Sequence, residues 1–425
     1  MNESKGSFFR QSAWMVMATV AGGGAMMLVH PLVSKKVGKA GYAEFKALLS
    51  AFYVIAAVGG GLWTLFAQQQ AAAVTEDDSR RVASAARRVG ITILLAWIGI
   101  AGVLALAQSA LVREWKLSNP ASLWATWLVG LLTLWGSVLR GLVQGRQNFL
   151  ALGWIAILDG FGRFAAVFVI LSFLAGRAAG AMTGAAVGTA GAILVGLWGS
   201  RDTLASRPAR VPWRAWLGGF VPLALNAAAL QLFQQYDNMF WQGLVPADRV
   251  DDWGLGARYS PAQTIGFGIT QFTVPLALVM LPRIARSVAM GERTDMLRLT
   301  LVATATMGGL ASLVCTLFPR LPLQVMFYNN PANWVASPLV PWFAWGMTVF
   351  TLANVLLNDL FARRRFAVVP GVMVLAVAYV GTLQWLKPRL LALPIEEAYR
   401  TGVGTLCAFN LALLALAAVF SRRRV

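Results

Sequence analysis

The chain has 425 residues, of which 58 % are hydrophobic and only 12 % are charged. Soluble domains carry about 25 % charged residues, so this composition excludes an ordinary soluble protein and is typical of a polytopic membrane protein. The formal net charge of +19 does not predict a nucleic-acid partner, because Lys and Arg gather in short loops between apolar runs. The two cysteines, Cys315 and Cys407, lie far apart in apolar segments and predict neither a disulfide nor a metal site.

Apolar runs long enough to cross a bilayer predict twelve helical spans. The first run lacks a small-residue cleavage motif, so we expect a retained helix and no removed signal peptide. The spans are 13–33, 45–67, 89–112, 121–141, 148–174, 178–199, 214–240, 257–281, 296–318, 335–360, 366–386 and 399–420. Lys and Arg are about twice as frequent in the loops on the side of the N-terminus, which predicts that both termini are cytoplasmic.

Two glycine triplets, 22–24 and 59–61, interrupt the first two spans. Glycine admits close approach between helix backbones and also weakens a helix, so close packing and a hinge are both open interpretations.

A polar, proline-containing stretch, 200–212, divides the spans six to six and predicts two lobes, 1–205 and 206–425. LRGLVQGRQNFLALG, beginning at Leu139, is weakly similar to LNDLFARRRFAVVPG, beginning at Leu357. An even number of spans per lobe starts both lobes on the same side of the membrane. We therefore expect an all-α integral membrane fold of about 12 transmembrane helices in two six-helix lobes. The lobes would be parallel repeats related by a pseudo-two-fold axis along the membrane normal, with a cavity between them.

Two opposite charges, Asp159 and Arg163, lie inside the fifth span. At about 1.5 Å per residue, Asp159 is roughly 17 Å beyond Asn148, near the middle of a hydrocarbon core about 30 Å thick. A charge at that depth costs about 3 kcal/mol, so it requires a partner or a wet cavity. Their spacing of four predicts an ion pair on one helix face. That pair either neutralises itself between packed helices or lines a water-filled interior.

The seventh span, NAAALQLFQQYDNMFWQG, carries an unusual number of amides and one carboxylate, Asp237. A polar stripe of this length predicts a polar interior surface, although Asp237 is near the outer end and would also reach interfacial water. The amide side chains that we expect to line a cavity are Asn226, Gln231, Gln234 and Asn238.

Several of these segments resemble a known family, the bacterial polysaccharide flippases, which export lipid-linked oligosaccharides. They belong to a superfamily that also holds multidrug and toxin extrusion transporters and lipid II flippases. VGKAGYAEFKALLS, from Val37, resembles the segment that joins the family's first two helices through Gly38, Tyr42 and Phe45. RGLVQGRQNF resembles the family's turn between helices four and five, and Asp159 with Arg163 falls where the family often has an acidic residue and an arginine.

The resemblance implies a transporter of the bacterial cytoplasmic (inner) membrane. By alternating access it would move a polyprenyl-pyrophosphate-linked oligosaccharide from the cytoplasmic to the outer leaflet. Arg163, Arg258 and Lys46 would hold pyrophosphate, since guanidinium groups match phosphate oxygens. The amides of the seventh span would meet sugar hydroxyls, while Asp159 or Asp237 would couple an ion to the cycle. Membrane lipid and glycan-assembly proteins are the expected partners, with no cofactor and no metal.

Three other functions are compatible with the same spans. A drug or cation exporter of the superfamily would share the architecture but would require an acidic cavity, whereas the charge within these spans is mixed. Another lipid exporter of the superfamily, a lipid II flippase, would be more similar, but such flippases usually carry two helices more than the twelve predicted here. A membrane-embedded glycan polymerase or ligase would require a large outer loop with catalytic residues. The longest outer gaps here, 241–256 and 319–334, contain no His. We see no nucleophile–base pair or phosphate-binding loop and expect no catalytic residue and no enzyme.

Overall fold

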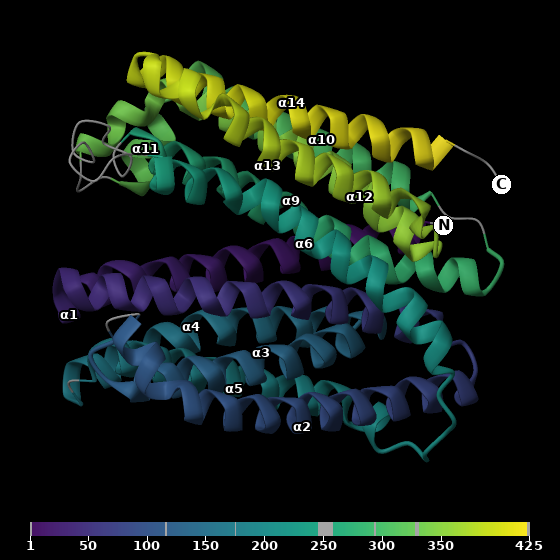
Figure 1. The fold of residues 1–425 in the computed structure, drawn as a ribbon. Coiled ribbons are helices and arrows are strands. Elements are labelled where there is room, and N and C mark those ends of the chain that lie inside the picture. Colours follow the sequence, from purple (N-terminus) through teal and green to yellow (C-terminus); the bar gives the residue numbers. More distant parts are fainter. Residues whose placement is uncertain are drawn as a thin grey trace. The chain divides into compact units, whose positions relative to one another are not determined.

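The computed structural model describes residues 2–114, 117–174, 176–244, 258–292, 295–327 and 331–422. Every regular element within these ranges is a helix (Figure 1). The first six are α1 (Asn2–Ala72), α2 (Glu76–Glu114), α3 (Pro120–Gly145), α4 (Phe149–Phe173), α5 (Arg177–Leu204) and α6 (Trp213–Leu244). The others are α9 (Ser260–Ala289), α10 (Met296–Leu317), α11 (Leu321–Met326), η2 (Pro331–Leu339), α12 (Val340–Ala362), η3 (Phe366–Val368), α13 (Val369–Ala392) and α14 (Ile395–Arg422).

Eleven helices in the described ranges are long and apolar enough to cross a membrane. Their outward faces carry large apolar side chains, of which Leu106 is 88 % exposed, Phe173 76 % and Trp385 76 %. Such surfaces are stable in the hydrocarbon core of a membrane, whereas in water they would promote aggregation. The prediction of an all-helical membrane protein is therefore confirmed.

Helix α1 contains the first two predicted spans, joined by residues that keep helical backbone geometry. The rings of His30 and Phe45 are 6.1 Å apart, whereas fifteen residues of straight helix would separate them by about 22 Å. The ribbon of α1 accordingly reverses direction (Figure 1). Its returning arm corresponds to the predicted span 45–67, which brings the total to about twelve.

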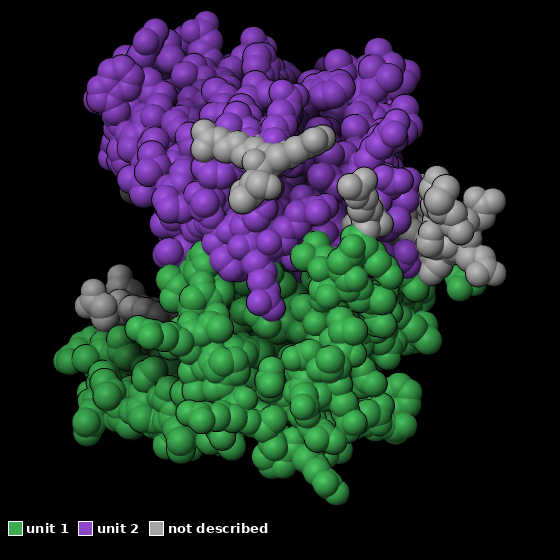
Figure 2. Space-filling model, turned by 90° about the vertical axis from the view of Figure 1, so that its right-hand side faces the viewer, with its two compact units in different colours: residues 1–224, 285–292 green, residues 225–284, 293–425 purple. Residues whose placement is uncertain are grey.

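By contacts between Cα atoms the chain forms two compact units, shown in different colours in Figure 2. Unit 1 comprises Met1–Ala224 with Ala285–Glu292, and unit 2 comprises Leu225–Ile284 with Arg293–Val425. The division runs through the interiors of α6 and α9. The predicted lobe boundary between residues 205 and 206 stays a prediction.

The turns that follow α3 and α12 have the same backbone design, in the two segments whose sequences are weakly similar. Gln147 and Arg364 each adopt a positive φ, 59° and 57°. In both turns the N–H of the following residue donates to the carbonyl five residues earlier, at 3.1 and 2.8 Å. This is the Schellman arrangement, in which glycine usually occupies the left-handed position. The similarity of the two segments thus extends to their local geometry.

Glycines set how closely the helices of unit 1 approach. A Cβ on Gly22 would collide with the carbonyl of Ala156 in α4, and one on Gly160 would collide with the backbone of Gly22. In the same way, a Cβ on Gly61 would lie only 2.7 Å from the Cα of Ala224. Close packing is therefore confirmed for these members of the triplets, whereas Gly23 and Gly24 face open space.

Candidate functional site

The predicted ion pair on α4 forms and is joined by two further groups from neighbouring helices. Asp159 and Arg163 are 7 % and 8 % exposed, and Arg163 Nε donates to Asp159 Oδ1 at 2.9 Å. From α3, Arg140 donates to Oδ2 of the same carboxylate at 2.7 Å. From α5, the hydroxyl of Thr189 donates to Oδ1 at 3.2 Å. We call Arg140, Asp159, Arg163 and Thr189 the unit 1 ion cluster.

The close approach of α4 and α5 brings these groups together. A Cβ on Gly188 would overlap the backbone nitrogen of Arg163, so only glycine permits this spacing between the two helices. Thr189, the next residue, is thereby placed within hydrogen-bond reach of Asp159.

Aromatic rings from the returning arm of α1 cover the other faces of the two guanidinium groups. Arg163 lies 5.6 Å from the ring centre of Phe52, and Arg140 lies 5.8 Å from that of Trp63. The Trp63 ring is held in turn by a 2.5 Å hydrogen bond from Nε1 to Gln144 Oε1. Each cation thus has both a carboxylate oxygen and an aromatic ring as neighbours, which offsets part of the cost of burying it.

A small cavity of about 20 Å³ adjoins the cluster. Its walls include Thr133, Arg140, Arg163 and Thr189 together with apolar residues of α3, α4 and α5. This volume accommodates about one water molecule. The cluster is therefore polar and nearly closed in the conformation described.

The cluster carries two cations against one anion. The side chain of Arg140 is 23 % exposed and that of Arg163 is 9 % exposed. Arg140 is therefore the more exposed of the two cations.

A second buried carboxylate lies in unit 2. Asp237 on α6 is 1 % exposed, and it accepts hydrogen bonds from Tyr259 Oη at 2.7 Å and from Gln263 Nε2 at 2.9 Å. The ring of Tyr259 packs 5.7 Å from that of Trp241. The suggestion that Asp237 merely reaches interfacial water is wrong, because neighbouring side chains enclose the carboxylate.

The remaining predicted site residues are spread over α1, α6 and the start of α9. Asn226 is buried and 6 % exposed, while Gln231 and Gln234 are half-buried. Arg258 lies two residues before the start of α9, and its side chain is 38 % exposed and 4.0 Å from that of Glu396. Lys46 and Asn238 belong to α1 and α6, but their side chains lie outside the described residues.

The prediction from sequence missed Arg140, Thr189, Tyr259 and Gln263. The resemblance of RGLVQGRQNF to a turn between helices four and five places Arg140 at the start of that turn; this is corrected, because α3 continues to Gly145. Leu142 and Val143 are both 0 % exposed, and this buried apolar pair just beyond Arg140 was the available signal. No comparable local signal marks Tyr259 and Gln263, which reach Asp237 from a different helix.

Comparison with known proteins gives no match to any family model and none to a curated protein sequence. Solved structures do match over almost the whole chain. A MATE transporter in the bent conformation aligns with a TM-score of 0.74 and 13 % identity, covering 98 % of this chain and 94 % of that one. A Vibrio cholerae MATE transporter in the bent form aligns with a TM-score of 0.72 and 14 % identity, covering 99 % and 98 %.

A third structure is a MOP superfamily transporter from Pyrococcus furiosus Vc1. It aligns with a TM-score of 0.72 and 12 % identity, covering 97 % of this chain and 94 % of that one. Its description states that the reversed polarity of its binding pocket suggests a different function. At these identities the similarity shows the fold alone: this chain has the fold of MATE and MOP superfamily transporters.

Proposed function

We propose that this chain is an alternating-access transporter whose cargo is a polyprenyl-pyrophosphate-linked oligosaccharide, moved from the cytoplasmic to the outer leaflet of a bacterial cytoplasmic membrane. The fold that it shares with MATE transporters supports transport in general. The observation that carries the choice of cargo is the charge balance of the unit 1 ion cluster, two guanidinium groups to one carboxylate.

An excess of buried positive charge favours an anionic cargo. A guanidinium group binds phosphate oxygens through two parallel hydrogen bonds. Arg140, which is partly exposed, would meet a pyrophosphate first, and Arg163 would join it as the helices separate. A cation carried by the same cluster would instead meet net repulsion.

Asp159 has a second role in this proposal. It bridges α3, α4 and α5 through Arg140, Arg163 and Thr189. A pyrophosphate that takes over one or both guanidinium groups would loosen these bridges, so binding of cargo and rearrangement of unit 1 would be coupled. Such coupling requires that cargo bind more tightly to the opened state than to the closed one.

The test uses a strain that lacks the chromosomal gene and carries plasmid-borne variants. Arg140→Gln and Arg163→Gln are compared with Arg146→Gln, whose surface partner Asp202 is 3.4 Å away. The first two are expected to reduce surface glycan at least tenfold and to accumulate lipid-linked oligosaccharide on the inner leaflet, with normal amounts of protein in the membrane. Full export by both would overturn the assignment of the cargo.

A cation or drug exporter is the second candidate, and one feature of unit 2 favours it. Asp237 is buried beside Tyr259 and Trp241, and carboxylates and aromatic rings together attract organic cations. In the same strain, export of a cationic dye that is lost in Asp237→Asn, with unchanged surface glycan, would favour this function over the first.

A further inference from the structure

One face of α14 carries both charged and apolar residues along about half of the helix. Glu396, Arg400, Cys407 and Leu411 are separated by four, seven and four positions. At 100° per residue these side chains fall within about 60° of one another around the helix. They therefore form a single stripe that begins at the end of the span and continues into its interior.

The charged end of the stripe borders a shallow hollow in unit 2. Its walls include Arg258, Glu396, Arg400 and Pro338. The ion pair between Arg258 and Glu396 is long, 4.0 Å, and its side chains are 38 % and 63 % exposed. Exposed pairs of this kind contribute little, so another charged group can insert between them at small cost.

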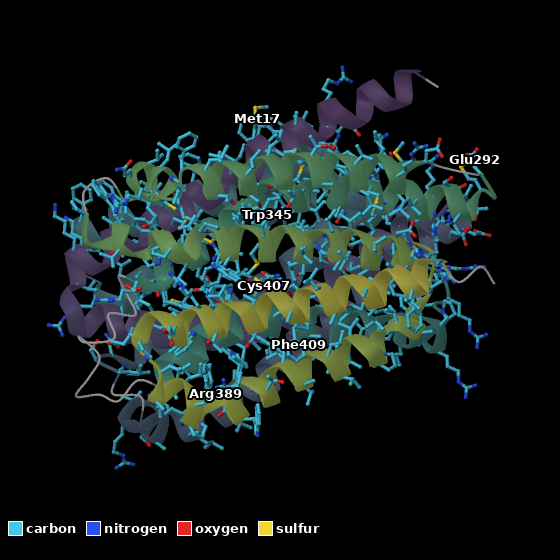
Figure 3. The ribbon with its side chains drawn as sticks, turned by 90° about the horizontal axis from the view of Figure 1, so that it is seen from above. Met17, Glu292, Trp345, Arg389, Cys407 and Phe409 are labelled. Atoms are coloured by element: carbon cyan, nitrogen blue, oxygen red, sulfur yellow. The ribbon has the colours of Figure 1, made fainter. Side chains whose placement is uncertain are left out.

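The apolar end borders a groove of about 360 Å³. Trp342 and Trp345 of α12 are 49 % and 46 % exposed there, and Leu411 is 56 % exposed. Trp345 and Cys407 lie on the neighbouring helices α12 and α14 (Figure 3).

Two polar groups of the groove, the indole N–H of Trp345 and the thiol of Cys407, have hydrogen-bond partners. Trp345 Nε1 donates to Thr316 Oγ1 at 3.1 Å, and Cys407 Sγ donates to the carbonyl of Trp342 at 3.3 Å. What remains for an occupant is almost entirely hydrocarbon surface. Such a surface does not hold water, and the three helices that bear it, α10, α12 and α14, are all membrane spans, so lipid chains are the available occupant.

We propose that this face of unit 2 binds one phospholipid with a phosphoethanolamine headgroup. The headgroup phosphate meets Arg400 and Arg258, the ammonium group meets Glu396, and one acyl chain lies in the groove beside Trp345 and Cys407. The site is separate from the unit 1 ion cluster and does not depend on which cargo is carried.

The combination of charges selects the headgroup. Two guanidinium groups suit a phosphate, and the single carboxylate among them supplies a partner for a primary ammonium group. A phosphoglycerol headgroup would satisfy the arginines but would leave Glu396 facing neutral hydroxyls. The geometry thus favours phosphatidylethanolamine over phosphatidylglycerol.

The test is native mass spectrometry of the full chain in detergent, titrated with phosphatidylethanolamine or phosphatidylglycerol of matched chains. The wild type is expected to bind one phosphatidylethanolamine about tenfold more tightly than phosphatidylglycerol. Arg400→Gln should weaken both lipids at least fivefold, whereas Arg389→Gln, an exposed arginine on α13, should change neither. Glu396→Gln should abolish the preference between headgroups, whereas the neighbouring Glu397→Gln should retain it.

The groove is tested by filling it. Val349→Phe places a ring among the groove residues and should weaken both lipids at least fivefold, while Val377→Phe, at a position 63 % exposed on α13, should not. Equal thermal stability of the variants separates lost binding from lost folding. Equal binding by Val349→Phe and Val377→Phe, or by Arg400→Gln and Arg389→Gln, would overturn the site, and an unchanged preference in Glu396→Gln would overturn the choice of headgroup.

Discussion

Arg140 and Asp159, on different helices, form a 2.7 Å hydrogen-bonded ion pair inside unit 1, where their side chains are 23 % and 10 % exposed. Asp159 also binds Arg163 on its own helix, so one carboxylate serves two guanidinium groups. A self-neutralising pair would not need Arg140. The cluster therefore holds one cation in excess, which makes it sensitive to the loss of its single carboxylate.

Replacement of that carboxylate should destabilise the protein more than replacement of either arginine. Asp159→Asn leaves two buried guanidinium groups facing one another, whereas Arg163→Gln leaves Asp159 bound to Arg140. Breaking a buried pair costs about 3 kcal/mol or more. The free energy of unfolding in mixed micelles should therefore fall by about that amount in Asp159→Asn and by clearly less in Arg163→Gln.

The matched control is Asp202→Asn, which removes the carboxylate of the surface pair with Arg146. Exposed ion pairs contribute little, so no measurable change is expected. Equal losses in Asp159→Asn and Asp202→Asn would show that the buried cluster does not contribute as its geometry implies.

A second prediction concerns the glycine triplet 22–24 of α1, whose members differ in how closely they are packed. Gly22→Ala would collide with α4, and Gly160→Ala would collide with Gly22, so each should lower thermal stability and reduce the amount of folded protein. Gly23→Ala and Gly24→Ala face open space and should be neutral, or stabilising by up to about 1 kcal/mol, because alanine is the better helix former. If all four variants behaved alike, close packing at Gly22 would not explain the triplet.

The sequence predicts helices and contacts between residues that are close along the chain, but it does not predict contacts between different helices. The spans follow from apolar runs, and caps such as Asn148, whose side chain accepts from the N–H of Ala151, are local signals. The pairing of Asp159 with Arg163 is also local, since a spacing of four places both on one helix face.

The partners that lie on other helices could not be predicted in this way. The resemblance to the family's turn places Arg140 at the end of a helix, but Leu142 and Val143 pack at 0 % exposure and α3 continues to Gly145. Tyr259 reaches Asp237 from α9, and its register relative to α6 is set by tertiary packing, which helical periodicity alone does not determine.

A third prediction concerns Asp237 and the groups that bind it. Tyr259→Phe removes a donor to a carboxylate that is 1 % exposed, and hydrogen bonds to buried charged groups contribute about 1.5–3 kcal/mol. The melting temperature of the purified variant should therefore be lower than that of the wild type. Tyr236→Phe, which removes a hydroxyl that accepts an exposed hydrogen bond from Gln384 at 2.7 Å, is the matched control and should cost clearly less. Equal stability of Tyr259→Phe and the wild type would mean that Gln263 holds Asp237 adequately by itself.

The last prediction is a stabilising substitution in the turn after α3. Gln147 has a φ of 59°, a left-handed conformation that costs a residue with a Cβ about 1 kcal/mol and that glycine adopts freely. Gln147→Gly should therefore raise the free energy of unfolding by about 0.5–1 kcal/mol, whereas Gln147→Ala should not. Arg146→Gly, one residue earlier at a φ of −74°, is the control and should be destabilising, because glycine there adds flexibility to the unfolded chain without relieving strain. Greater stability of both glycine variants would point to a general effect of loop composition, whereas a gain at residue 147 alone would establish the turn as a site of stored backbone strain.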